Sequence, residues 1–195
     1  MATTSAKLKK QYTPEEYLAL DRKAEYKSEY FDGEIFAMSG ASRKHNLIVW
    51  NIGAALHRQL RKRRCEAYAG DMRVKVSQTG LYTYPDLTIV CDTPRFDDSE
   101  MDILLNPLVI FEVLSKSTES YDRGAKFANY RTIESLNDYI LISQDKYLAE
   151  HYIRQPGNLW LFPAYSKPED LIIIDSAGCE LALADIYEKV NLSES

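Results

Sequence analysis

Residues 108–114 are Leu108-Val109-Ile110-Phe111-Glu112-Val113-Leu114, the most apolar run of the chain. A run this continuous predicts a β-strand that is buried on both faces. Alternation along a strand places Glu112 on one face with Ile110 and Leu114. A carboxylate there is expensive to desolvate unless it is paired, protonated or bound to a metal. The stretch therefore predicts a central strand that carries a functional acid, with a buried salt bridge or an emerging strand end as the alternatives.

The segment that follows this strand predicts a βαβ unit. We expect a helix over residues 121–131 and a strand over residues 139–143, which makes the two flanking strands parallel neighbours. Three further strands are expected over residues 147–154, 159–165 and 171–175, and a closing helix over residues 183–190. The carboxyl-terminal third is therefore predicted to be a β-meander.

The segment that precedes the strand alternates helices and short strands. Thr13-Pro14-Glu15-Glu16 has the pattern of a capping box at a helix start. Asp32-Gly33 predicts the turn of a hairpin over residues 26–38. Ser42 is expected to cap a long helix that reaches about residue 64, strands are expected over residues 72–76 and 85–91, and an acidic loop over residues 93–106. Together these patterns predict an α/β domain, bordering on α+β, with a mixed sheet.

Composition restricts the function classes. The chain has 195 residues, 45% of them hydrophobic, which suits one domain; we expect a flexible arm over residues 1–12 and a single domain over residues 13–190. No apolar run approaches the roughly 18 residues of a membrane helix, so a cytoplasmic protein without a membrane partner is expected.

The three cysteines are widely spaced and suggest neither a zinc site nor a disulfide framework. Cys91 is expected to be a small buried apolar residue.

The net charge of −5 argues against binding nucleic acid by bulk charge, but it leaves a local basic patch open. The strongest candidate for such a patch is a run of cations near the end of the long helix, formed by Arg58, Arg61, Lys62, Arg63 and Arg64. Cations at a helix C-terminus also complement the helix dipole, which is the simpler explanation. A track for nucleic-acid phosphates is the functional one.

A second carboxylate, Asp86, opens the expected strand over residues 85–91. On neighbouring strands Asp86 and Glu112 could converge, and two carboxylates on rigid strands suit a hard cation such as Mg²⁺. Phosphodiester hydrolysis also calls for a positive charge beside the developing negative charge. Lys116 and Lys126 are the available lysines, although Asp122 and Lys126 also have the spacing of an ordinary helix ion pair.

A family resemblance covers about residues 13–190. The motifs that carry it are Tyr30-Phe31-Asp32-Gly33-Glu34-Ile35, His45, Asp71-Met72-Arg73-Val74, Tyr84-Pro85-Asp86, Glu112-Val113-Leu114-Ser115, Ser117-Thr118, Asp122, Lys126 and Tyr130. In this order they resemble the Uma-two family of restriction endonuclease-like proteins, which belongs to the PD-(D/E)XK nuclease-like superfamily. The resemblance implies a restriction-endonuclease-like core, a mixed β-sheet flanked by helices, and metal-dependent phosphodiesterase activity.

The resemblance also assigns roles to residues. Asp86 and Glu112 would bind the metal, Mg²⁺ or Mn²⁺, with the Val113 carbonyl as a third oxygen. The superfamily's lysine two positions after the glutamate is absent, because that position holds Leu114. Lys126 on the next helix matches the place from which the family takes its lysine, and Lys116 is the fallback.

The resemblance gives two further residues a place near the site. It implies that His45 faces the active site and that Asp71 is an accessory acid near the metal. A satisfied histidine at a helix start is the plainer interpretation of His45, and a cross-strand ion pair that of Asp71. Glu34 follows the hairpin turn and is expected to be solvated.

The sequence therefore predicts a Mg²⁺- or Mn²⁺-dependent endodeoxyribonuclease that acts on DNA, with a homodimer as a further expectation from the resemblance. A catalytically inactive interaction module with the same fold is the alternative, supported by Leu114 and by the acidic net charge. A hydrolase that uses two carboxylates on another substrate, as glycosidases do, is a second alternative.

Overall fold

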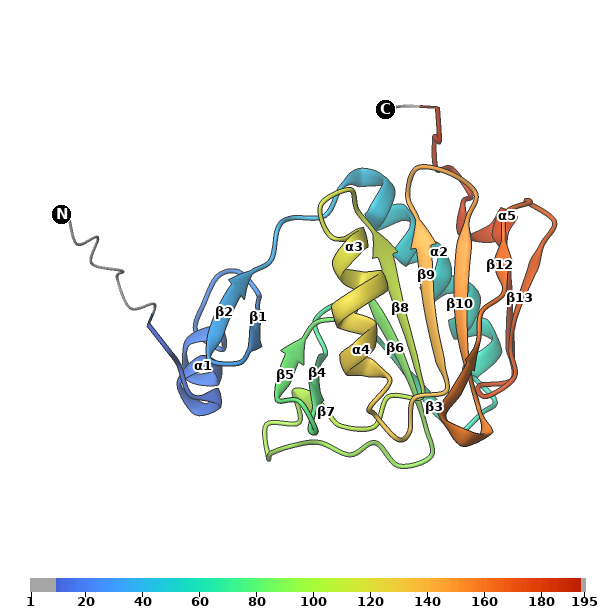
Figure 1. Cartoon of the computed structure of the whole chain (residues 1–195). Helices are drawn as coiled ribbons and strands as arrows, with labels where there is room; N and C mark the ends of the chain where they lie inside the picture. The colour runs from blue at the N-terminus through green and yellow to red at the C-terminus, as the bar shows by residue number, and fades with distance from the viewer. Residues whose placement is uncertain (1–9, 194–195) are drawn as a thin grey trace.

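Two mixed sheets dominate the computed structural model, which describes residues 10–193 (Figure 1). The larger sheet has the order β11 (Leu159–Leu161), β10 (Ala149–Gln155), β9 (Asp138–Ser143), β8 (Val109–Leu114), β6 (Leu87–Cys91), β3 (Cys65–Ala69), and β12 (Ala164–Tyr165) pairs with β10. The smaller sheet has the order β2 (Glu34–Ala37), β1 (Ser28–Phe31), β5 (Leu81–Thr83), β4 (Arg73–Val76), β7 (Ile103–Leu104). Strands β13 (Leu171–Ile174) and β14 (Cys179–Ala182) form a hairpin of their own.

Helices cover both faces of the larger sheet (Figure 1). Helix α2 (Arg43–Leu60) lies on one face, and α3 (Glu119–Tyr121), the π-helical turn η1 (Asp122–Lys126) and α4 (Phe127–Tyr130) lie on the other. The remaining helical segments are α1 (Pro14–Asp21), the short 3-10 turn η2 (Pro156–Asn158) and α5 (Leu183–Ile186). Mixed sheets flanked by helices are the restriction-endonuclease-like architecture that the family resemblance implies.

The expected βαβ unit is confirmed. Strands β8 and β9 pair in parallel from Val109↔Asp138 to Leu114↔Ser143, and the α3–η1–α4 segment is the connection between them. All six residues of β8 are buried. Val109, Phe111 and Val113 pack in the core beneath α2, whereas Ile110 and Leu114 pack on the α4 side. This alternation sends the Glu112 side chain to the α4 side as well.

The capping box and the hairpin turn are also confirmed. The Thr13 side chain accepts from the Glu16 N–H, while the Glu16 side chain accepts from the Thr13 N–H. Asp32 and Gly33 both have positive φ, as the tightest hairpin turns require. Residues 1–9 of the expected arm lie outside the described residues. Tyr12 is not loose, because its N–H donates to the carbonyl of Gly33.

The sequence missed four strands, all of them short: β3, β5, β7 and β14. Helix α2 ends at Leu60 rather than near residue 64, because residues 65–69 pair with β6 as an edge strand. The expected helix over residues 121–131 is interrupted by η1, and the closing helix ends at Ile186. Strand β7 lies inside the expected acidic loop.

The expectation for the cysteines is wrong. Cys65 and Cys91 form a disulfide between β3 and β6, where they are direct partners in the register. Sequence spacing could not show this, because the pairing depends on an edge strand that the pattern did not reveal. None of the described helices is long and apolar enough to span a membrane.

Candidate catalytic cluster around Glu112

Glu112 is the buried acid that the apolar strand predicts. It is 5% exposed, and its Oε1 accepts a hydrogen bond from the Tyr130 hydroxyl at 3.0 Å. Burial raises the pKa of Glu112 well above its ordinary value; Lys126 opposes this rise, and the charges of Asp86 and Asp122 add to it. The fold therefore holds this carboxyl out of water, with Asp86 and Asp122 near enough to add to the effect.

Lys126 reaches the cluster from η1. Its Nζ lies 2.8 Å from Glu112 Oε1, 3.3 Å from Glu29 Oε1 and 3.6 Å from Asp122 Oδ1. Burial disfavours the charged ammonium, but these acids, Glu112 first, outweigh burial and raise the pKa of Lys126 well above its ordinary value. Lys126 is therefore a buried basic side chain shared among three acidic ones.

The π-helical turn accounts for the position of Asp122 and Lys126. Both side chains are buried, although both are ionisable. Turns of this kind occur mostly as single wide turns within α-helices and frequently at functional sites. Burial also raises the pKa of Asp122, which Lys126 opposes. The Asp122 carbonyl accepts from the Tyr139 hydroxyl at 3.0 Å, which ties the turn to β9.

Asp86 lies immediately before β6, beside the part of β8 that extends past the end of that strand. Its Oδ2 accepts from the Val113 N–H at 2.6 Å, and its Oδ1 lies 3.0 Å from His45 Nε2. The side chain thus takes the place of a strand partner for Val113. Since Asp86 accepts, His45 donates from Nε2, and His45 Nδ1 is buried without a hydrogen-bond partner among the described residues.

The donor set fits a hard divalent cation. In a strand the N–H and C=O of one residue point to the same side, so the Val113 carbonyl faces the Asp86 side of β8. Asp86, Glu112 and that carbonyl would supply oxygen ligands only, as Mg²⁺ prefers. Among residues 10–193, no group of three or more His, Cys, Asp or Glu side chains is placed to hold a metal.

Glu29 is a member of the cluster that the sequence did not single out. It lies in β1 of the smaller sheet, is 9% exposed, and accepts from the Thr83 hydroxyl on β5 besides pairing with Lys126. A hairpin strand often has one face in solvent, where a carboxylate is readily hydrated. The sequence around Glu29 therefore does not indicate that its side chain is buried. The smaller sheet supplies Glu29 by packing against α3 and η1.

Three other candidates lie apart from these contacts. Asp71 belongs to the turn before β4 rather than to the strand, its side chain is 97% exposed, and it pairs with Lys27 at 3.0 Å. No described hydrogen bond or ion pair joins it to Asp86 or Glu112. Lys116 is exposed in the turn after β8. Glu34 begins β2 and is half-buried.

Comparisons with known proteins agree with this architecture. The family model described as "Uma2: Putative restriction endonuclease" matches residues 14–184. Two uncharacterized proteins of Synechocystis sp. are similar: one is 38% identical over 149 residues (76% of this chain, 84% of the relative), the other 35% identical over 175 residues (90% of each). The crystal structure of a putative nuclease belonging to DUF820 from Anabaena variabilis superposes with a TM-score of 0.74 and 19% identity, covering 91% of this chain and 98% of that one.

Proposed function

The chain belongs to the Uma2 family of putative restriction endonucleases, and from this premise we propose that it is a divalent-cation-dependent endonuclease that hydrolyses phosphodiester bonds of DNA. One observation carries the proposal: the buried Lys126 ammonium nitrogen lies 2.8 Å from Glu112, and Asp86 accepts a hydrogen bond from Val113, the residue that follows Glu112 in β8. Two acids and one cation on rigid elements are the groups that phosphoryl transfer requires.

Each residue has a role in the proposed mechanism. Asp86, Glu112 and the Val113 carbonyl would hold Mg²⁺ or Mn²⁺, which when bound would lower the pKa of a water molecule and stabilise negative charge on the phosphate. His45 holds the Asp86 carboxylate in position through Oδ1. Lys126 would direct its ammonium towards the charge that develops on the phosphate oxygens. Tyr130 fixes the Glu112 carboxylate by donating its hydroxyl proton to Oε1, the oxygen that also lies beside Lys126.

Plasmid cleavage in Mn²⁺ tests the proposal. We expect the wild-type protein to nick or linearise supercoiled DNA, and Glu112→Gln and Lys126→Met to be slower by about 100-fold or more, the range seen when one stabilising group is removed. Lys116→Met is the matched control, since Lys116 is exposed and lies outside the cluster. A wild-type protein that leaves the plasmid intact in both Mg²⁺ and Mn²⁺, or a Glu112→Gln variant that cuts normally, would overturn the proposal.

An inactive interaction module is the second candidate, and one observation favours it. Both oxygens of Asp86 already have protein partners, and Glu112 already has Lys126 as its counter-ion. Calorimetric titration with Mn²⁺ separates the two candidates. The nuclease requires a site that disappears in Asp86→Asn, whereas the module shows no heat of binding at millimolar Mn²⁺. Light scattering on the same samples tests the proposed homodimer.

A further inference from the structure

The most uneven distribution of charge in the molecule lies along α2 and the turn that follows it. Residues 43–64 contain seven of the 24 Lys and Arg residues and none of the 29 Asp and Glu residues. Five of these cations gather at the carboxyl end of the helix and are called the basic turn here: Arg58, Arg61, Lys62, Arg63 and Arg64. All five are exposed.

No partner within the described residues neutralises the basic turn. None of its five side chains makes an ion pair with a described carboxylate, whereas the acidic segment over residues 97–102 is largely paired: Asp97 binds Lys75, and Asp98 and Asp102 bind Arg22. Five like charges within seven residues repel one another. The five mutually repelling cations stand together in a protein whose net charge is −5.

The helix dipole does not explain the cluster. The dipole rewards cations in the last helical turn by about 0.3–1 kcal/mol each, and the effect fades beyond that turn. Helix α2 ends at Leu60, so only Arg58 lies in its last turn, and the other four cations lie after it. The helix dipole therefore explains only Arg58 among the five cations.

The backbone of the basic turn is held on both sides. The Arg63 N–H donates to the Leu60 carbonyl at 2.8 Å, and the Arg64 carbonyl accepts from the Asp92 N–H at 2.6 Å. The next residue, Cys65, is covalently joined to Cys91. These bonds fix the backbone of the basic turn, which limits the backbone entropy that binding of a partner would remove.

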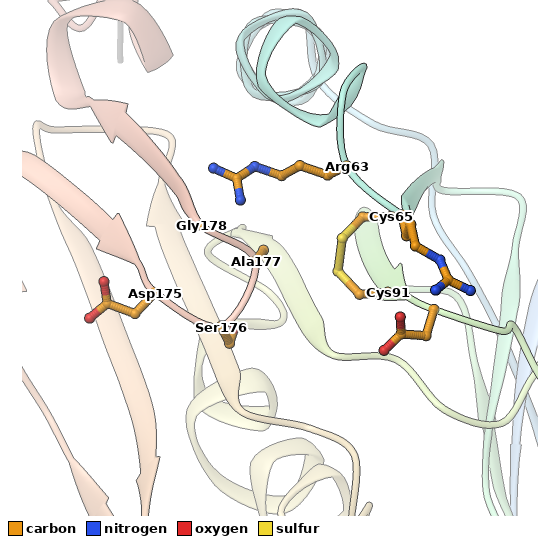
Figure 2. Close-up of a pocket in the computed structure, with 9 residues that line it drawn as sticks. Arg63, Cys65, Cys91, Asp175, Ser176, Ala177 and Gly178 are labelled. Atoms are coloured by element: carbon orange, nitrogen blue, oxygen red, sulfur yellow. A yellow bond between two sulfur atoms is a disulfide. The ribbon is translucent and has the colours of Figure 1, made fainter.

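The Arg63 side chain lies beside another part of the fold. Arg63 lines an open pocket of about 390 Å³. Figure 2 shows its side chain extending towards the loop between β13 and β14, where Gly178 lies. The guanidinium lies against Gly178, close enough that a Cβ built there would lie 2.3 Å from Arg63 Nη1. Asp92 and Asp175 also line the pocket, but neither forms an ion pair with Arg63 or Arg64.

We propose that the basic turn is a docking surface for the sugar–phosphate backbone of a nucleic acid, separate from the Glu112 cluster. The proposal rests on the proposed function and extends it. A regularly spaced polyanion suits several unpaired guanidinium groups on a rigid turn, because each can replace a counter-ion. The first turn of α2 carries His45 at the cluster, so the two sites are separated by the length of this 18-residue helix, about 27 Å. That length corresponds to about eight base pairs.

Binding of a 20-base-pair duplex, measured by fluorescence anisotropy in EDTA across a salt series, tests the proposal without cleavage. The test variant is Arg61→Gln/Lys62→Gln/Arg64→Gln, which spares Arg63 and its packing on Gly178. The control is Lys23→Gln/Arg131→Gln/Lys167→Gln, three exposed cations from separate parts of the chain. Each phosphate contact contributes about 0.9 to the slope of log affinity against log salt. We expect the test variant to lose about 2.7 from the slope and at least 10-fold in affinity, and the control to lose much less.

Each outcome decides the question. Equal slopes for the wild-type protein and the test variant, or a wild-type protein that binds no duplex at low salt, overturn the docking surface. Binding of polyglutamate as tight as that of the duplex at equal charge also overturns it, because the surface would then suit an acidic protein. Cleavage by Glu112→Gln at the wild-type rate, together with the expected change of slope, refutes the proposed site and leaves the docking surface intact.

Discussion

Replacement of Lys126 by methionine removes the only cation that the described contacts give to Glu112, Glu29 and Asp122 together, and leaves a side chain of similar length. Removal of one partner from a buried ion pair typically costs about 3–5 kcal/mol, because the remaining charge stays buried. With three acids around Lys126, we expect Lys126→Met to lie at the upper end of that range near pH 8. Such a loss is a large part of the 5–15 kcal/mol that stabilises a typical domain.

The loss should depend on pH in one direction. Burial raises the pKa of Glu112 and of Asp122 above their ordinary values, and in both Lys126 opposes the rise, so its removal raises both pKa values further. A carboxyl with a raised folded-state pKa stabilises the fold below its unfolded pKa and loses that contribution as the pH rises through the folded value. The difference between Lys126→Met and the wild-type protein should therefore shrink as the pH falls from 8 towards 5.

Urea unfolding at pH 5, 6, 7 and 8 measures this difference directly. Lys116→Met is again the control, and we expect it to change the free energy of unfolding by less than about 0.5 kcal/mol, as for other exposed sites. Equal stability of Lys126→Met and Lys116→Met at every pH would refute the reasoning. A loss that grows as the pH falls would refute it as well.

Two further predictions concern stability away from the cluster. The Cys65→Ser/Cys91→Ser variant lacks the disulfide, which joins residues with a sequence separation of 26. In non-reducing buffer it should lose about 3.5 kcal/mol of unfolding free energy by the loop-entropy relation. Reductant should destabilise only the wild-type protein. Asp21→Asn breaks the buried pair with Arg73 and should cost about 3–5 kcal/mol at pH 7 in chemical denaturation. Burial favours the protonated form of Asp21, but hydrogen bonds, that of Tyr84 first, hold its pKa below the ordinary value. The stability that the charge of Asp21 provides is therefore present above about pH 4 and is lost as the pH falls through the pKa of the folded state. A wild-type protein that gains stability on acidification from pH 4 to pH 2 would contradict this.

The elements that sequence predicts well are those whose pattern is local. The capping box at Thr13, the turn at Asp32-Gly33 and the buried strand β8 each depend on a few adjacent residues, and the structure has all three. The missed strand β5 has only three residues, and β3 has no buried residue to mark one of its faces. Both form only because β6, β1 and β4 lie beside them. Their existence depends on contacts that are distant in the sequence.

The same distinction applies to the cluster. The burial of Glu112 follows from its own strand, and the family pattern points to Asp86 and Lys126. Glu29 comes from the smaller sheet, and nothing near it in the sequence distinguishes a buried acid from a solvated one. Asp71 lies in the turn before β4, two residues before the strand begins at Arg73, so it is not part of the strand.

The wide turn η1 has a consequence for tracing this site through other sequences. In a regular α-helix each residue advances about 100°, so Asp122 and Tyr130, eight residues apart, would face directions about 80° apart. A π-turn absorbs one extra residue, which makes the effective separation seven and returns the two side chains to within about 20° of each other. A relative one residue shorter would keep this phase with an ordinary helix, and its lysine would follow the acid by three positions instead of four. A search pattern with a fixed interval between acid and lysine would pass over such a chain, although both chains would build the same cluster.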